Sequence, residues 1–80
     1  ATKSLAQEVA SRGITVNAVA PGIIDTAMIA SAFKADDIAR LVPMKRVGQP
    51  SEVADLIGFL ASEQAAYITG QIISINGGMI

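Results

Sequence analysis

The chain contains no cysteine and no histidine among its 80 residues. Without cysteine there is no disulfide framework and no thiolate metal site. Without histidine, the commonest catalytic base and the commonest metal ligand are both absent. The sequence therefore predicts no metal site, and it offers no catalytic residue of either kind.

Charge is also scarce and nearly balanced. Charged residues make up 16% of the chain, against about 25% in a typical globular domain, and the net charge is −1. This balance lacks the basic footprint that nucleic-acid binding requires. No apolar run approaches the roughly 18–20 residues of a membrane span. We therefore expect neither a nucleic-acid nor a membrane partner, and the lack of cysteine fits a cytoplasmic location.

What is abundant is apolar surface. The chain is 51% hydrophobic, with a mean hydropathy of +0.49, which is too apolar for a disordered segment. An isolated core of this size rarely supplies more than roughly 3–5 kcal/mol of stability without a staple. The first apolar stripe also begins without an initiating methionine or a capping residue. We expect the chain to be a piece of a larger core, with sequence missing upstream, or part of an oligomer.

Hydrophobic periodicity predicts an α/β fold. Apolar stripes with helical spacing indicate helices, and short runs of β-branched residues indicate strands buried on both faces. Two strands joined by so long a helical crossover should be parallel, with a right-handed βαβ connection. The predicted order is a helix over 1–12, a strand over 14–20, one or two short helices within 26–42, a helix from Pro50 to about Ser62, and a strand over 71–76.

The most informative segment is the first predicted strand and the turn that follows it. Pro21 cannot donate to a ladder and Gly22 permits unusual dihedral angles, so together they end the strand. In parallel α/β sheets, ligands bind at the carboxyl ends of the strands. Backbone groups and the Thr26 hydroxyl beyond this turn would suit a flat polar ligand. Alternatively, Thr26 is only the N-cap of the next helix, and Pro21-Gly22 only a turn.

Short motifs along the whole chain carry a resemblance to a known family. They resemble, in order, the C-terminal part of the short-chain dehydrogenase/reductase superfamily. Within it the chain is most similar to the 3-oxoacyl-[acyl-carrier-protein] reductase group of fatty acid biosynthesis, although sugar and steroid reductases share many of these motifs. The motifs lie at Ser4–Asn17, Pro21-Gly22, Asp25-Thr26, Arg46–Pro50, Glu52–Ala54, Phe59–Ser62, Ala66–Gly70 and Asn76–Gly78.

The resemblance implies that residues 1–80 form the C-terminal portion of one Rossmann-like, doubly wound parallel sheet. It also implies NADP(H) as the cofactor. The cofactor-binding residues would be Pro21, Gly22, Ile24 and Thr26 in a nicotinamide loop. Main-chain groups near Ile24 would meet the carboxamide, and Thr26 would add a hydroxyl contact.

The resemblance further implies a substrate, a β-keto acyl thioester carried by acyl carrier protein. Residues 27–42 would form the substrate lid, in which Met28, Ile29 and Phe33 contact the acyl chain; the alternative is a plain packing stripe. Arg12 would face the acidic carrier protein, where complementary charge steers association. The simpler reading of Arg12 is a solvated cation that complements a helix C-terminus.

Two features of the family are missing from the chain. There is no G-x-G-x-x-G phosphate turn, and Tyr67 is followed four residues later by Gln71 rather than by lysine. The family's catalytic serine, tyrosine and lysine would therefore lie upstream, so we assign no catalytic residue here and expect the chain alone to be inactive. One alternative function is a non-catalytic, self-associating piece, since residues 51–76 resemble the interface of this tetrameric family. Another is a short-chain dehydrogenase acting on a sugar, steroid or small alcohol.

Overall fold

The computed structural model describes residues 1–79, and the element order agrees with the order expected from the sequence. A helix and a short 3₁₀ turn precede the first strand, and three helices and a second 3₁₀ turn separate it from the second strand. The described elements are α1 (Thr2–Val9), η1 (Ala10–Arg12), β1 (Ala18–Pro21), α2 (Ala27–Ala32), α3 (Ala35–Leu41), α4 (Pro50–Leu60), η2 (Glu63–Ala65) and β2 (Ile72–Ile75).

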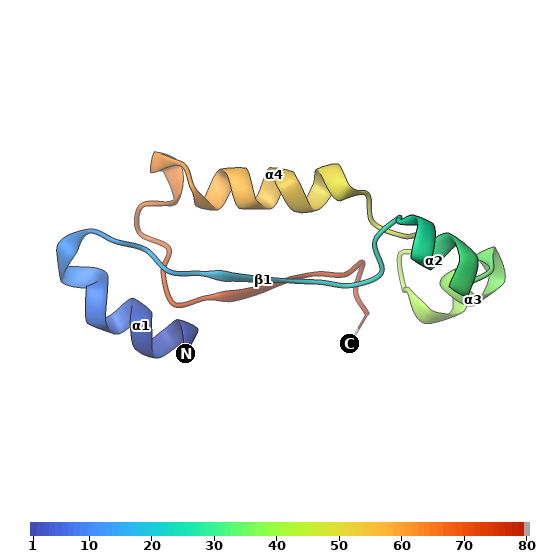
Figure 1. Ribbon diagram of the computed structural model, residues 1–80, viewed down its shortest axis with the longest axis horizontal. Helices are drawn as coiled ribbons and strands as arrows, with labels where there is room; N and C mark the ends of the chain where they lie inside the picture. The colour runs from blue at the N-terminus through green and yellow to red at the C-terminus, as the bar shows by residue number, and fades with distance from the viewer. Residues whose placement is uncertain (80) are drawn as a thin grey trace.

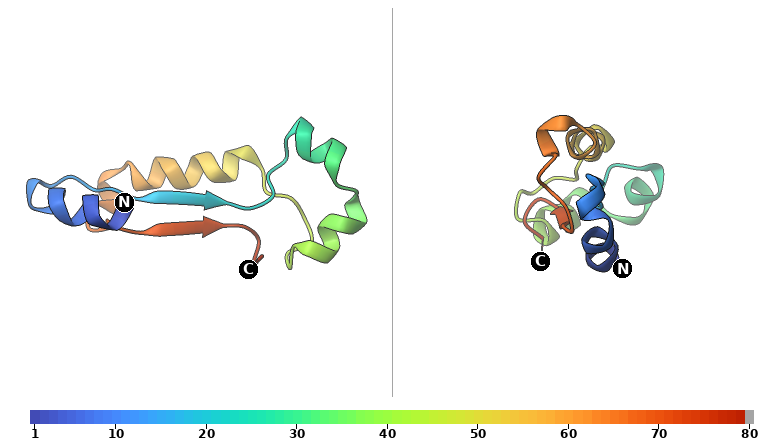
Figure 2. Two further views of the ribbon diagram at one scale, coloured as in Figure 1. Left: turned by 60° about the horizontal axis from the view of Figure 1, so that its bottom comes forward. Right: turned by 90° about the vertical axis from the view of Figure 1, so that its left-hand side faces the viewer.

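The two strands pair in parallel, so the predicted α/β class and strand direction are confirmed. Their register runs from Ala18 opposite Ile72 to Pro21 opposite Ile75. Helix α4 lies along one face of this two-stranded sheet and α1 lies on the other side of it (Figures 1 and 2). Helices α2 and α3 lie beyond the carboxyl ends of the strands, at the opposite end of the molecule from α1 (Figure 1).

The predicted strand 14–20 is shorter in the structure, where regular pairing is confined to β1. Ahead of β1, hydrogen bonds of the Asn17 side chain help to join this segment to residues 68–71. Its amide donates to the carbonyl of Ile68 at 3.1 Å, and its Oδ1 accepts from the N–H of Gln71 at 3.1 Å. The partner segment turns at Gly70, whose φ is +71°, and this turn ends regular pairing. The Asn17 side chain therefore has a structural role.

Helix α4 begins at Pro50, as predicted, but ends at Leu60 rather than Ser62. Its side toward the sheet carries Val53, Leu56 and Leu60, which are half-buried, whereas Ile57 is 52% exposed. Only two strands lie beneath α4, so the sheet covers one side of its apolar stripe.

The buried core is small and scattered. Its members are all short or β-branched: Ala6, Val9, Ile38, Val42 and Ala65. The radius of gyration is 15.3 Å, against about 11.7 Å for a compact domain of this length. The accessible surface is 5762 Å², against about 4,500 Å² for a compact protein of this mass.

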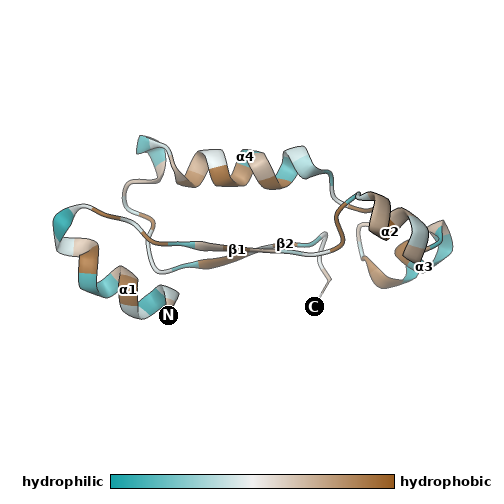
Figure 3. Cartoon of the chain, in the orientation of Figure 1, coloured by the Kyte–Doolittle hydropathy of each residue, from teal (hydrophilic) through white to brown (hydrophobic). Residues whose placement is uncertain are grey.

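Several large apolar side chains are exposed. Apolar residues follow α4 and both strands (Figure 3), and Phe59, Tyr67 and Ile72 are 46%, 103% and 58% exposed. The Tyr67 side chain is therefore fully exposed within residues 1–79. Within residues 1–79, no helix combines the length and the apolar character that crossing a membrane requires.

We predict that the 80-residue chain on its own self-associates or fails to fold, because its exposed apolar faces and open strand edges favour association. Sedimentation velocity with circular dichroism over a range of concentrations tests this. A concentration-independent monomer with a cooperative unfolding transition would contradict it.

Candidate functional site

The candidate site is the loop 22–26, which leaves β1 at the edge where both strands end. Pro21 lies opposite Ile75 in the register, and the Gly22 N–H donates to the Ile75 carbonyl at 3.0 Å. A Cβ on Gly22 would lie 2.7 Å from the Asn76 Cβ and 2.9 Å from its Cα. Glycine is therefore required here for the close approach of two backbones, which confirms the strand-ending role of this pair.

The middle of the loop is held by a single parallel bridge between Ile24 and Gly48. Gly48 N–H donates to the Ile23 carbonyl at 2.9 Å, and the Asp25 N–H donates to the Gly48 carbonyl at 2.8 Å. In this pattern the N–H and C=O of Ile24 itself point away from Gly48. Within residues 1–79 neither of these two groups has a hydrogen-bond partner. The loop thus presents a donor and an acceptor side by side, which is complementary to a primary carboxamide.

Thr26 ends the loop as the N-cap of α2. Its Oγ1 accepts a hydrogen bond from the Ile29 N–H at 3.2 Å, so the capping interpretation is confirmed. A hydroxyl that accepts in this way keeps its own proton for donation. The ligand role of Thr26 is therefore chemically compatible with its capping role.

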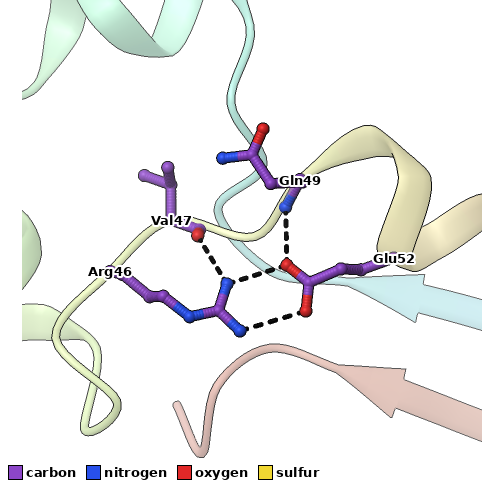
Figure 4. Close-up of polar contacts among 4 residues, drawn as sticks. All are labelled: Arg46, Val47, Gln49 and Glu52. Atoms are coloured by element: carbon purple, nitrogen blue, oxygen red, sulfur yellow. Dashed lines mark hydrogen bonds and ion pairs between the residues drawn. The ribbon is translucent and has the colours of Figure 1, made fainter.

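An ion pair between Arg46 and Glu52 lies next to the Ile24–Gly48 bridge. The Arg46 guanidinium donates to both carboxylate oxygens of Glu52, at 2.7 and 3.0 Å, and also to the Val47 carbonyl at 3.1 Å (Figure 4). Glu52 Oε1 accepts in addition from the Gln49 N–H at 3.0 Å, in a capping box at the start of α4. The two side chains are 51% and 40% exposed. These contacts tie together residues on both sides of Gly48, namely Arg46 and Val47 before it and Gln49 and Glu52 after it.

The pairing shifts the titration of both groups. The hydrogen bond from Arg46, followed by the one from the Gln49 N–H, lowers the pKa of Glu52 from its ordinary 4.5 to about 2, and the pKa of Arg46 is raised by the same contact. Because the folded-state pKa of Glu52 lies below its unfolded value, its stabilising contribution is complete above about pH 4.5 and is lost as the pH falls toward 2.

Two hollows adjoin the loop. A cleft of about 140 Å³ lies between the loop, the 44–48 segment and the end of β2, and it is lined in part by Ile24, Arg46 and Asn76. A cavity of about 320 Å³ lies between α2, α3 and residues 45–47, and Ile29 and Phe33 are on its wall. Met28, by contrast, is 78% exposed. The structure therefore gathers two of the three predicted acyl contacts around one space.

Arg12 lies far from this space. It is the last residue of η1, directly after α1, and α1 is at the other end of a molecule 48 Å long (Figure 1). Arg12 and the lid residues therefore do not form one surface within this chain. Among residues 1–79, no group of three potential ligand side chains is placed to hold a metal ion.

Sequence reasoning missed the contribution of the 44–49 connector to the site. In the sequence, Arg46–Pro50 stands out only as one of the family-like motifs. The available signal was the spacing of Gln49 and Glu52, which is that of a capping box. Nothing in the sequence indicates that Gly48 would bridge to Ile24, because that contact joins segments far apart in the chain.

We predict that Gly22→Ala destabilises the full-length protein by about 1–3 kcal/mol, because its methyl group would overlap the Asn76 backbone and force the strand ends apart. Urea denaturation measures the effect. A free energy of unfolding equal to that of the unsubstituted protein would refute the prediction.

A second prediction concerns Lys45, the non-glycine residue with a positive φ, +63°. This conformation costs a residue with a Cβ about 1–2 kcal/mol, part of which is offset by the larger unfolded-state entropy of glycine. Lys45→Gly should therefore stabilise the protein by up to about 1 kcal/mol, measured by urea denaturation. Lys45→Ala keeps the Cβ and removes only the ammonium group, so it should give no such gain. Stabilisation by alanine equal to that by glycine would show that charge, rather than backbone strain, is responsible.

Comparison with protein families gives a match over the whole chain. The family model described as enoyl-(acyl carrier protein) reductase matches residues 1–80. The 3-oxoacyl-[acyl-carrier-protein] reductases of Vibrio cholerae and Synechocystis are each 54% identical to this chain over 80 residues. These alignments cover 98% and 99% of this chain, but 33% and 32% of the relatives. The chain thus spans about a third of the length of the curated relatives it matches.

Solved structures give the same result for the fold. A 3-oxoacyl-[acyl-carrier protein] reductase from Brucella melitensis superposes with a TM-score of 0.91 at 42% identity, covering 98% of this chain and 30% of that protein. A short-chain dehydrogenase/reductase double mutant from Serratia marcescens superposes with a TM-score of 0.87 at 44% identity, covering 96% of this chain and 32% of that one. The helices and parallel strands described above therefore correspond to part of a larger α/β fold.

Proposed function

Because these 80 residues belong to the short-chain dehydrogenase/reductase superfamily, we propose that they form the C-terminal third of an NADP(H)-dependent 3-oxoacyl-[acyl-carrier-protein] reductase. The observation that carries the proposal is the outward-facing N–H and C=O of Ile24 at the carboxyl end of β1. This is the edge of a parallel sheet where a dinucleotide binds. The choice of substrate rests on the names of the relatives.

The residues of the loop would hold the nicotinamide. The Ile24 N–H would donate to the carboxamide oxygen, the Ile24 carbonyl would accept from the carboxamide nitrogen, and the Thr26 hydroxyl would donate its remaining proton. Pro21 and Gly22 would end β1, and the close approach of Gly22 to Asn76 would fix where the loop starts. When bound, NADPH would supply a hydride to the β-keto carbon of the thioester.

The lid segment 27–42 would hold the acyl chain. Ile29 and Phe33 line the open hollow between α2 and α3, beside the polar side chains of residues 45 and 46, and these two apolar side chains would bind an acyl chain by removing its surface from water. Exposed Met28 would contact the part of the substrate that reaches solvent. Arg12 would meet the acidic carrier protein, at a surface remote from this cavity within one chain.

The other parts of the site would come from outside this segment. The chain has no Tyr-x-x-x-Lys spacing and no glycine-rich phosphate turn, so residues 1–80 alone should not reduce substrate. The exposed apolar side chains of α4 and β2, among them Phe59 and Ile72, support an oligomer interface within 51–76. A homotetrameric, cytoplasmic enzyme is the assembly we propose.

A second candidate is an enoyl thioester reductase, favoured by one observation: the matching family model is described as an enoyl-(acyl carrier protein) reductase. The two activities use the same cofactor loop and differ in the group reduced, a ketone in one and a carbon–carbon double bond in the other. The described residues do not distinguish them, because the proton donor would lie outside this chain.

We predict that the full-length protein oxidises NADPH with a 3-oxoacyl thioester, more slowly or not at all with the matching 2-enoyl thioester, and that the 80-residue chain does neither. Absorbance of NADPH, followed with each substrate at equal concentration for the full-length protein and for the 80-residue chain, tests all three statements. The same measurement with NADH tests the choice of cofactor. A preference for the enoyl substrate would replace the proposed function by the second candidate. Lack of reaction with either substrate would remove both.

A further inference from the structure

We infer that Arg46 and Glu52 are positioning residues, whose ion pair fixes the turn around Gly48 and so sets the direction in which the N–H and C=O of Ile24 point. The inference rests on the proposed function in one respect, since it takes the loop 22–26 to be a nicotinamide loop. Its structural part, the dependence of the loop on the ion pair, is independent of that identity.

The first step is the geometry around Gly48. Arg46 holds Glu52 with two hydrogen bonds and the Val47 carbonyl with a third, while Glu52 accepts from the Gln49 N–H (Figure 4). The residues immediately before and after Gly48 are therefore both anchored to one ion pair. A bidentate arginine–carboxylate contact fixes orientation as well as distance. Gly48, which has no side chain to hold it, takes its place from these neighbours.

The second step leads from Gly48 to the loop. Between Gly22, which bonds to β2, and Thr26, which caps α2, the loop has two backbone hydrogen bonds within residues 1–79. Both are made with Gly48, one to the Ile23 carbonyl and one from the Asp25 N–H. A rotation or shift of Gly48 would release both bonds. The peptide groups of Ile24 would then lose their fixed direction.

The hydrogen-bonding groups of the ion pair are mostly directed at each other. One edge of the Arg46 guanidinium is occupied by both oxygens of Glu52, and the Glu52 carboxylate already accepts three hydrogen bonds. Both residues line the cleft of about 140 Å³ beside Ile24, but their charges are matched to each other rather than directed at a ligand. Their role is therefore to position the loop, not to bind the cofactor.

Helix α3 provides an internal control for this role. Asp37 occupies the same third position of its helix, accepts from the Lys34 N–H at 3.2 Å and pairs with Arg40 at 3.0 Å. It thus combines a capping box with an exposed ion pair, as Glu52 does. Neither Asp37 nor Arg40 is bonded to the loop. Asp37→Asn therefore serves as a control for Glu52→Gln that has no connection to Gly48, although Asp37 pairs with Arg40 through one hydrogen bond and Glu52 with Arg46 through two.

The test compares these two variants in the full-length protein. Glutamine keeps an oxygen that can accept from the Gln49 N–H, so Glu52→Gln weakens the pairing with Arg46 while retaining the helix cap. We expect amide hydrogen exchange at Gly48 and Asp25 to become about two- to fivefold faster, the range typical of an exposed ion pair. The dissociation constant of the NADPH complex should rise by a similar factor. Asp37→Asn should alter neither quantity, and Arg46→Lys, which loses the bidentate contact, should resemble Glu52→Gln.

Three results would overturn the inference: unchanged exchange at Gly48 and Asp25 in Glu52→Gln, equal acceleration in Asp37→Asn, or faster exchange without a weaker NADPH complex. Equal acceleration in Asp37→Asn would reduce the pair to a general contribution to stability, and faster exchange with an unweakened NADPH complex would show that the direction of Ile24 does not control cofactor binding. If the wild-type protein binds no NADPH, the proposed function fails instead, and the dependence of the loop on the ion pair is then decided by the exchange measurement alone.

Discussion

The parallel pairing of β1 and β2 is the interaction on which the rest of the arrangement depends. Parallel strands place their carboxyl ends at one edge, so this pairing brings the loop 22–26, the end of β2 and the 44–49 connector to the same place. The tight approach of Gly22 to Asn76 sets the distance between the two chain segments there. A glycine in this position is a geometric requirement of the pairing, whether or not a ligand binds beside it.

A polar framework stabilises this edge, where little apolar burial is available. None of the side chains of α4 is fully buried, and the loop itself is held by backbone hydrogen bonds to Gly48. The charged pair of Arg46 and Glu52 is hydrogen-bonded to the residues immediately before and after Gly48. Exposed ion pairs contribute little to global stability, but they can fix the local direction of a backbone segment. Local direction is what a hydrogen-bonding loop requires.

The incomplete core has a direct consequence for function. Within residues 1–79, the five buried apolar side chains are divided among α1, the lid region and η2. The sheet has two strands and α4 covers one face of it (Figures 1 and 2). The relatives that this chain matches are about three times as long. A complete reductase site would therefore need residues from beyond this segment, while the loop geometry is already present within it.

By itself, the sequence determined the class of fold, the order of its elements and the family. Periodicity is a local property, so the helix beginning at Pro50, the break at Pro21-Gly22 and the capping role of Thr26 follow from residues close to one another in the chain. The tertiary structure decided the rest. It shortened the first strand through the turn at Gly70, left Ile57 exposed above a narrow sheet, and separated Arg12 from the lid residues. It alone joined Ile24 to Gly48, because that contact depends on how distant segments pack, and no local pattern encodes such a distance.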